Sequence, residues 1–462
     1  MKVGINAYFL RYPLTGTGTY LRELVAAMGQ AEPECRLRLY VPRGVVDPAF
    51  VARGYDLKMV PVPAGAASHW GKLFFEQLLF PRAALEDGCE VIHAPYLAPP
   101  VLGARIAVTT IHDLIPLVLP QYRRGPLAGA YALLTSVTAR RSARILCDSA
   151  WTKRDVVQRL GVPAGRVRVV HLAAGSQCTA AVSAENRTVD FPRDGELARV
   201  RRRYELPEPY ILYYGGFDRR KAVDVLLRAY ARLRCEQPQA PALVLAGRLP
   251  RRASAALFDP RPMVEALGQG DQVRMTGAFD EAEKAALLAG ARLFVFPSIY
   301  EGFGLDPLEA MARGVPVVST RATSIPEVCE GAAVLVRPGD ERDLAAGMSL
   351  VLGDDRLRGQ LRDKGLARAA QFSWRTTAQA TAAVYREVAA AKHRTPRVEA
   401  APASTLGALG GEERCSPSFL CFNPHLARRP GATRTRVSRP TVSIVAGPTE
   451  VFLDVNPTPV IR

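Results

Sequence analysis

Short apolar runs alternate along the first half of the chain with segments in which apolar residues recur every three or four positions. A short apolar run between turn residues is typical of a buried strand, and the longer recurrence is typical of an amphipathic helix. The runs predict strands at residues 2–7, 36–41, 57–62, 91–94, 105–111, 144–147 and 167–171. The recurrences predict helices at residues 21–28, 72–85, 131–144 and 149–160. Such an alternation predicts a parallel sheet covered on both faces, as in a Rossmann-like domain.

The second half repeats this alternation. Apolar runs predict strands at residues 210–214, 242–246, 293–296, 315–319 and 332–336. Helical patterns cover residues 223–233, 281–289, 341–352, 355–371 and 374–391, and residues 273–277 are predicted to form a turn. The chain of 462 residues is long enough for two or three domains. We therefore predict an α/β protein with a second Rossmann-like domain.

Two segments interrupt the pattern. Residues 183–209 combine several prolines with a charged run at 199–203, which predicts an interdomain linker with one short helix. From residue 393 onward Pro, Gly, Ser, Thr and Arg dominate and the periodicity is lost, apart from a β-like patch at 442–445. We therefore predict that residues 393–462 form a disordered tail.

The stretch LFVFPSIYEGFGLDPLEAMARGVPVVST, residues 293–320, is read as strand, loop, helix, turn and strand. Asp306 is predicted as the helix N-cap, with Pro307 at the first helical position, Glu309 as its capping-box partner and Gly314 just past the helix end. A glycine loop that enters a helix after a parallel strand is a ready anion site, because free backbone N–H groups point toward one spot. The loop is favoured over the helix end as that site, since Asp306 places an anion beside the helix amides.

Glu301 and Glu309 bracket this loop. Taken singly, Glu301 also fits a solvated loop acid and Glu309 a plain capping residue. Together, Glu301 with EGFGL and Glu309 within PLEAMA resemble the family-four retaining glycosyltransferases of GT-B fold. The resemblance covers about residues 1–392 and implies two Rossmann-like domains that face each other across a cleft.

The resemblance also assigns roles to domains. It implies an acceptor domain at 1–182, the linker at 183–209, a donor-nucleotide domain at 210–373 and a final helix at 374–392 that packs back on the first domain. Glu301 and the backbone of Gly302, Phe303, Gly304 and Leu305 would hold the donor sugar and diphosphate, with Glu301 as a catalytic residue. Glu309 would bind the ribose hydroxyls, since a carboxylate is a good acceptor for a diol.

Three further segments match the family. The segment Thr15–Thr19 precedes the first predicted helix, and the resemblance places Gly16 and Gly18 at the donor, although a flexible turn explains the same glycines. His112 follows a predicted strand, at the end where ligands bind in open α/β sheets, and the resemblance makes it the second catalytic residue, with a structural histidine or a cap neighbour as the alternative. Lys221 matches a family lysine that faces the donor diphosphate, and either Arg219 or Arg220 supplies a second cation there. A solvated helix start is the alternative for this basic run.

Composition limits the chemistry. The chain contains no Asp-x-Asp sequence and no Cys-x2-Cys pair, so we predict neither a metal site nor a cofactor. The net charge of +17 favours acidic partners such as a nucleoside diphosphate or an anionic lipid surface. We expect no nucleic-acid partner. Scattered cysteines, and the lack of an apolar run of membrane-spanning length, predict a cytoplasmic protein, with peripheral contact at the inner face of the membrane as a further hypothesis.

The combined prediction is a retaining, metal-independent glycosyltransferase that uses a nucleoside-diphosphate sugar and a glycan or lipid-linked acceptor. The HDLIP segment that contains His112 resembles bacterial mannosyltransferases of surface polysaccharide assembly, which suggests GDP-mannose as the donor. Three alternatives stay open: a sugar-nucleotide epimerase of the same fold, a glycosidase with two carboxylates, and a non-catalytic sugar-binding or scaffold protein.

Overall fold

The computed structural model describes residues 1–12, 15–43, 54–62, 69–97, 99–122, 126–176, 178 and 194–394. All of these lie in one compact unit, Met1–Arg397. The predicted tail from residue 395 onward, with its β-like patch, and the linker residues 183–193 lie outside the described residues.

The first half of the described chain is built on a seven-stranded parallel sheet. In spatial order its strands are β3 (Leu57–Val60), β2 (Arg36–Pro42), β1 (Lys2–Asn6), β4 (Val91–Ala94), β5 (Ala107–Ile111), β6 (Arg144–Cys147) and β7 (Val167–Val169). The strand order reverses between β1 and β4, and both the central strand β4 and its neighbour β5 are buried along their whole lengths. Six of these strands fall within the predicted runs, and β2 extends one residue beyond its run at 36–41.

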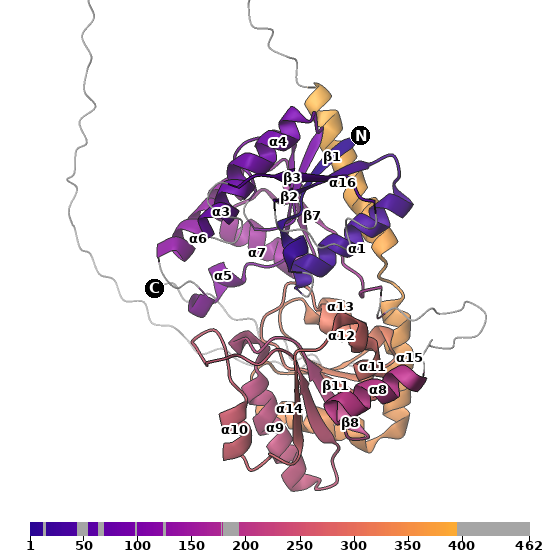
Figure 1. The fold of residues 1–462 in the computed structure, drawn as a ribbon. Helices are drawn as coiled ribbons and strands as arrows, with labels where there is room; N and C mark the ends of the chain where they lie inside the picture. Colours follow the sequence, from indigo (N-terminus) through magenta and orange to yellow (C-terminus); the bar gives the residue numbers. More distant parts are fainter. Residues whose placement is uncertain are drawn as a thin grey trace, which may run out of the picture. The chain divides into compact units, whose positions relative to one another are not determined.

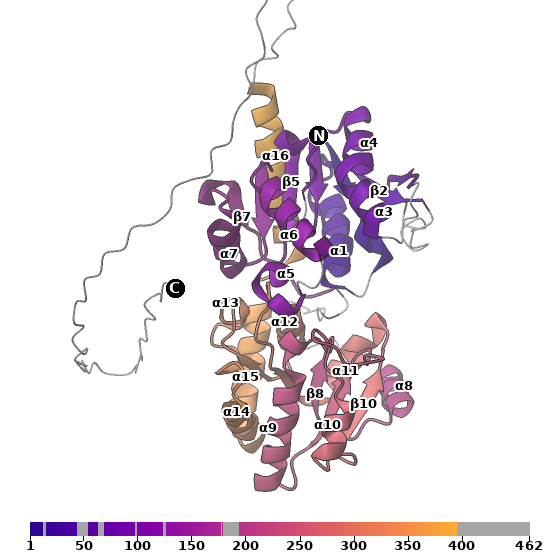
Figure 2. The same cartoon turned by 90° about the vertical axis from the view of Figure 1, so that its left-hand side faces the viewer.

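Helices cover both faces of this sheet (Figures 1 and 2). They are α1 (Gly16–Ala31), α3 (His69–Phe74), the π-helix η2 (Phe75–Leu79), α4 (Phe80–Glu86), α5 (Ile115–Val118), α6 (Pro126–Ala139) and α7 (Ala150–Leu160). Short 3-10 turns are η1 (Tyr8–Arg11), η3 (Ala104–Ile106), η4 (Pro120–Tyr122) and η5 (Ala164–Arg166). One prediction was wrong here: the glycine segment is not a loop before the helix, because α1 already begins at Gly16.

The second half contains a six-stranded parallel sheet. Its order is β10 (Val273–Gly277), β9 (Ala242–Ala246), β8 (Tyr210–Tyr214), β11 (Ala291–Phe296), β12 (Val317–Thr320) and β13 (Val334–Val336). The order reverses between β8 and β11. Residues 273–277 were predicted as a turn, and this was wrong, because they form the edge strand β10.

The second sheet is also covered on both faces, with α9 and α14 on one side and α8 and α11 on the other (Figure 1). The helices are α8 (Asp194–Tyr204), α9 (Val223–Glu236), α10 (Arg261–Ala266), α11 (Lys284–Ala289), α12 (Leu305–Ala312), α13 (Ile325–Cys329), α14 (Glu341–Gly353) and α15 (Asp355–Ala369), with 3-10 turns η6 (Arg219–Lys221) and η7 (Glu281–Glu283). Helix α8 lies within the segment predicted as a linker with one short helix.

The last helix, α16 (Trp374–Arg394), returns to the first half of the chain and lies beside α1 (Figure 1). The indole of Trp374 donates to the Ala174 carbonyl at 3.0 Å, and the Tyr385 hydroxyl lies 2.6 Å from Nδ1 of His93, which is fully buried. The helix extends three residues beyond the end of its predicted pattern at 391 and two beyond the end at 392 that the resemblance implied, so residues 393 and 394 belong to α16 and not to the predicted tail. These buried polar contacts fix α16 against the first sheet.

Candidate active site

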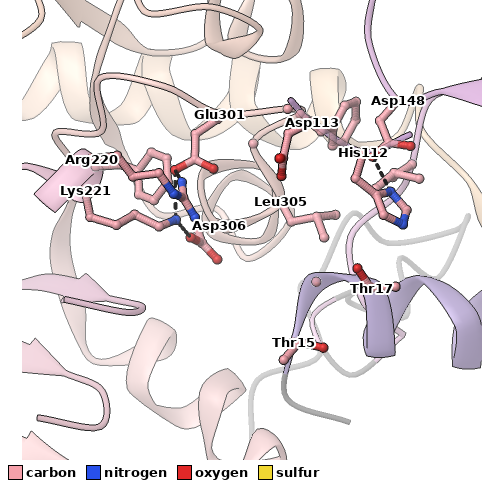
Figure 3. A pocket seen from close by; sticks show the side chains of 16 residues that line it. Thr15, Thr17, His112, Asp113, Asp148, Arg220, Lys221, Glu301, Leu305 and Asp306 are labelled. Carbon is pink, nitrogen blue, oxygen red and sulfur yellow. Dashed lines mark hydrogen bonds and ion pairs between the residues drawn. The ribbon is translucent and has the colours of Figure 1, made fainter. Parts of the chain in front are cut away.

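The basic run and the acidic loop meet at the strand reversal of the second sheet. Arg220 and Lys221 follow β8, and Glu301 follows β11, which is the neighbour of β8. The Oε1 atom of Glu301 lies 2.6 Å from Nη1 of Arg220, 2.9 Å from Nζ of Lys221 and 2.6 Å from the Ser298 hydroxyl. Figure 3 shows both cations directed at this carboxylate. Since the carboxyl ends of neighbouring parallel strands share one edge, this cluster lies where open α/β sheets bind ligands.

Helix α12 begins differently from the prediction. Its N-cap is Gly304, with φ of 120°, a backbone conformation that strongly favours glycine. Asp306 therefore lies inside the first turn, and its carboxylate accepts from Nζ of Lys221 at 3.0 Å. The assignment of Asp306 as N-cap, with Glu309 as its capping-box partner, was wrong. The helix end was predicted correctly, because Gly314 has φ of 69° and the Val315 N–H closes onto the Ala310 carbonyl.

Gly302 connects the EGFGL loop to the first half of the chain through hydrogen bonds. Its carbonyl accepts from the hydroxyls of Ser149 at 2.7 Å and Thr152 at 3.0 Å. Ser149 is also the N-cap of α7 and accepts from the Thr152 N–H. A Cβ atom at position 302 would overlap the carbonyl oxygen of His112, so only glycine permits this close approach.

His112 forms a dyad with Asp148. Ile111 and Cys147 are register partners on β5 and β6, so the residues that follow them lie side by side. Nδ1 of His112 is 2.7 Å from Oδ2 of Asp148, and the buried Nε2 has no hydrogen-bond partner within the described part of the chain. Burial lowers the pKa of His112, but the Asp148 carboxylate more than offsets this and leaves the pKa above its ordinary value. Asp148 was not among the predicted site residues. Its position at a strand end places it near the ligand-binding edge, but its pairing with His112 depends on the register between β5 and β6.

The first turn of α1 completes the site. Thr15 is the N-cap and accepts from the Gly18 N–H at 3.1 Å, so Gly18 is buried within the turn. Gly16 and Thr17 instead face a cavity of about 250 Å³ between the two sheets. The cavity is lined by Thr15, Gly16, Thr17, His112, Asp113, Asp148, Leu172, Arg220, Lys221, Phe296, Glu301, Gly302, Phe303, Gly304, Leu305 and Asp306.

Three predicted site residues do not line this cavity: Gly18, Arg219 and Glu309. Nε of Arg219 donates to the Ser254 carbonyl at 3.2 Å, so Arg220 is the arginine that accompanies Lys221. Glu309 is 1% exposed and accepts from the Tyr214 hydroxyl at 2.8 Å and from Nζ of Lys284 at 3.0 Å. Its Oε1 lies near Gly175, where an added Cβ would be 3.3 Å away.

Glu301 and Asp113, two acids that line this cavity, differ in the direction in which their surroundings shift the pKa. Burial raises the pKa of Glu301, but Arg220 and Lys221 lower it by more, so the net pKa lies below its ordinary value. Burial raises the pKa of Asp113 above its ordinary value, and the Ile115 N–H, a backbone donor, only partly offsets this. Glu301 is thus held as a carboxylate, whereas Asp113 protonates more readily than an exposed aspartate.

Two negative findings apply to the described residues alone. Among them, no group of three or more His, Cys, Asp or Glu side chains is placed to hold a metal ion. None of the described helices is both long enough and apolar enough to cross a membrane.

The fold is the GT-B fold of glycosyltransferases. Among solved structures, the Anabaena protein HepE in complex with UDP-glucose aligns with 84% of this chain and 100% of its own, with a TM-score of 0.62 and 17% identity. At this identity the likeness establishes the fold alone, and it confirms the predicted pair of Rossmann-like domains.

The sequence comparisons identify the family. The model described as Glycosyltransferase Family 4 matches residues 14–173, and the model described as Glycosyl transferases group 1 matches residues 197–368. O-antigen chain mannosyltransferase B of Escherichia coli is 31% identical over 403 residues, which cover 84% of this chain and all of that relative. D-inositol 3-phosphate glycosyltransferase of Corynebacterium jeikeium is 33% identical over 214 residues, 45% of this chain and 51% of the relative. The chain therefore belongs to the family-four glycosyltransferases, as its motifs predicted.

Proposed function

We propose that the chain transfers a sugar from a nucleoside-diphosphate donor to an acceptor hydroxyl, with retention at the anomeric carbon and without a metal ion. The observation that carries this proposal is the placement of Arg220 and Lys221 on the wall of the cavity that the EGFGL loop also lines. A departing nucleoside diphosphate accumulates negative charge, and preorganised cations stabilise such charge in a water-poor site.

The diphosphate would lie between the cations and the start of α12. The first N–H groups of a helix have no partner inside it, and the helix dipole is positive at that end. Nζ of Lys221 lies 2.9 Å from the Glu301 carboxylate and 3.0 Å from the Asp306 carboxylate, so two acids already accept from this cation. A bound diphosphate would compete with these two carboxylates for Lys221, and the first N–H groups of α12 would supply further donors to it.

The donor and the acceptor together account for every bond that forms or breaks in the proposed transfer and for the proton that moves. The acceptor oxygen bonds to the anomeric carbon on the face from which the nucleoside diphosphate departs, and the bond from that carbon to the phosphate oxygen breaks. The acceptor proton passes to the departing phosphate, and the products are a glycoside and the nucleoside diphosphate. All three contacts of Glu301 described above converge on Oε1, so Oε2 is able to accept from a donor-sugar hydroxyl.

His112 and Glu309 would hold the two ends of the donor. Asp148 fixes the His112 ring through Nδ1, and His112 would contact the sugar from the wall of the cavity. Glu309 would accept from the ribose hydroxyls near Gly175, which leaves room because it has no side chain. In this arrangement Glu309 exchanges part of its contact with Lys284 for the ribose.

The donor is proposed to be GDP-mannose. The name of the Escherichia coli relative, which this chain matches over its full length, and the HDLIP segment both support mannose. Titration of the protein with GDP and with UDP in separate calorimetric experiments tests the base. We expect tighter binding of GDP, and tight UDP binding without GDP binding would refute this choice.

Donor hydrolysis tests the site itself. We expect Lys221→Ala to lower the rate of GDP-mannose hydrolysis about 100-fold or more, which is the size of effect seen when one group that stabilises developing charge is removed. Glu309→Ala removes the proposed acceptor for the ribose hydroxyls and should lower the rate about 10-fold or more, since a hydrogen bond to a charged group contributes about 1.5–3 kcal/mol. Near wild-type rates in both variants would show that the site is misassigned. Release of an epimerised free sugar would favour the epimerase, and turnover of no sugar nucleotide would favour the scaffold.

A peripheral membrane contact is proposed for the helical segment from α3 to η2. Its outer face exposes Trp70 at 63%, Phe74 at 41% and Leu78 at 42%. These side chains line an apolar hollow of about 590 Å³ together with Val101 and Leu134. An exposed apolar patch that includes a tryptophan suits the membrane interface, where a lipid-linked acceptor would be found.

A further inference from the structure

We propose that a second cavity beside the donor site is the acceptor subsite, and that its acidic lining selects an uncharged sugar ring over a phosphorylated or carboxylated one. This inference rests on the proposed transfer reaction and specifies the chemical class of its acceptor.

The second cavity has a volume of about 210 Å³. It is lined by Thr17, Tyr96, Leu97, His112, Asp113, Ile115, Pro116, Tyr122, Asp218 and Arg220. Pockets that enclose drug-sized molecules measure roughly 300–1,000 Å³, so this one has room for a single small ring. Thr17, His112, Asp113 and Arg220 also line the donor cavity, so a ring bound here would lie directly beside the donor sugar.

The charges of this second cavity are unfavourable for an anion. Two carboxylic acids, Asp113 and Asp218, face it. Arg220 is its one cationic lining residue besides His112, and Nη1 of Arg220 already donates to Glu301 at 2.6 Å and to the Tyr300 carbonyl at 3.1 Å. The Nδ1 atom of His112 is engaged by Asp148. No lining cation is therefore left without an acidic partner to neutralise an incoming phosphate.

The same lining suits a neutral polyol. Carboxylates accept hydrogen bonds from hydroxyl groups, and the Tyr122 hydroxyl both donates and accepts. This hydroxyl now lies 3.4 Å from Oδ1 of Asp218, a long contact that a sugar hydroxyl could replace. Tyr96 adds an aromatic wall and is held by Phe9, with ring centroids 4.6 Å apart. An aromatic surface with a few fixed polar groups is typical of a small-molecule site.

The proposed preference for a neutral acceptor distinguishes this chain from one of its relatives. The relative from Corynebacterium jeikeium is named for an acceptor that carries a phosphate, D-inositol 3-phosphate. A phosphate placed in the second cavity of this chain would share that small cavity with Asp113 and Asp218, and the repulsion between like charges opposes binding. We therefore expect the phosphorylated member of any matched acceptor pair to be the poorer substrate by at least 10-fold in kcat/KM.

The experiment measures transfer from the sugar nucleotide that the chain hydrolyses to two matched acceptor pairs. The pairs are methyl α-mannoside with its 6-phosphate, and myo-inositol with D-inositol 3-phosphate. Asp218→Asn removes one charge at constant size and should narrow the neutral-to-phosphorylated ratio by 3- to 10-fold. Tyr122→Phe keeps the charges and should raise KM for both members of a pair without changing their ratio. Asp224→Asn, on α9 and paired with Arg228 away from the cavity, is the matched control and should leave the ratio unchanged.

The outcomes are decisive in both directions. A preference for the neutral member that narrows in Asp218→Asn alone supports the acceptor subsite. The assignment is overturned if a phosphorylated acceptor is used as well as its neutral partner. It is equally overturned if Asp218→Asn behaves like the control, or if the donor is hydrolysed but no neutral acceptor receives sugar. Loss of donor hydrolysis in the wild-type chain would instead refute the proposed function itself.

Discussion

Gly302 is the position at which the two halves of the site are closest, so Gly302→Ala is the most informative small change. A methyl group there would overlap the His112 carbonyl oxygen and lie 2.8 Å from its carbon and 3.0 Å from Cβ of Asp113. Carbon atoms in favourable contact are about 3.5–4.0 Å apart. The oxygen is the closest atom, at 1.9 Å from the added Cβ. Close carbon–oxygen contacts measure about 3.3–3.6 Å, so the loop and the His112 segment must separate by roughly 1.4–1.7 Å.

A displacement of this size changes the positions of side chains from both halves of the site. It moves Glu301 relative to His112 and lengthens the hydrogen bonds from Ser149 and Thr152 to the Gly302 carbonyl. A misplacement of about 1 Å in a catalytic arrangement lowers a rate about 100-fold. We therefore expect kcat/KM for sugar transfer to fall about 100-fold in Gly302→Ala, with far-UV circular dichroism unchanged.

Gly359→Ala is the matched control. It makes the same substitution in the exposed part of α15, where no atom lies within 4 Å of the added Cβ, so activity should stay within about twofold. Steady-state transfer kinetics on both variants, with thermal unfolding to confirm that each is folded, provide the comparison. Activity of Gly302→Ala within threefold of wild type would refute the view that this contact sets the catalytic geometry.

Three further predictions concern the charges and the surface. Arg220→Ala should lower the rate of donor hydrolysis at least 10-fold, whereas Arg219→Ala should lower it less than threefold, because Arg220 is the one of these two arginines that contacts Glu301. Equal losses of rate in the two variants would contradict this. Burial raises the folded-state pKa of Asp113 above 3.8, so the folded chain loses stability as pH rises through that pKa. Asp113→Asn keeps the hydrogen bond from the Ile115 N–H and should therefore raise the melting temperature at pH 7.5. This gain in melting temperature should shrink as the pH is lowered toward 4. An equal gain at pH 7.5 and pH 4 would argue against the buried Asp113 charge as its cause. Trp70→Ser should reduce sedimentation with phosphatidylglycerol vesicles at least threefold, whereas Leu350→Ser, at an exposed position on α14, should not.

The strands of the second half illustrate what the hydrophobic pattern can predict. The five-residue runs at Tyr210–Tyr214 and Ala242–Ala246 match β8 and β9 residue for residue, because strands covered on both faces are apolar throughout. β10 was missed because it is an edge strand that pairs only with β9 and carries Arg274, Thr276 and Gly277. Polar residues at an edge resemble a turn when only local sequence is considered.

Site residues were predictable where a motif is local and not where a partner is distant. The EGFGL loop could be located from its motif, yet Asp306 resembled an N-cap because nothing local reveals the positive φ of Gly304 or the ion pair with Lys221, 85 positions away. Asp148 depends on the register between β5 and β6, which sequence periodicity does not supply. The contact between Glu309 and Lys284 likewise depends on how α11 and α12 pack.

The most direct test of the account follows the reaction by proton NMR. The wild-type chain is incubated with GDP-α-mannose and methyl α-mannoside in the presence of excess EDTA. We predict that an α-linked disaccharide forms and GDP is released, and that the disaccharide signal is lost in Lys221→Ala. A β-linked product, or a reaction that begins only when a divalent metal is restored, would contradict it.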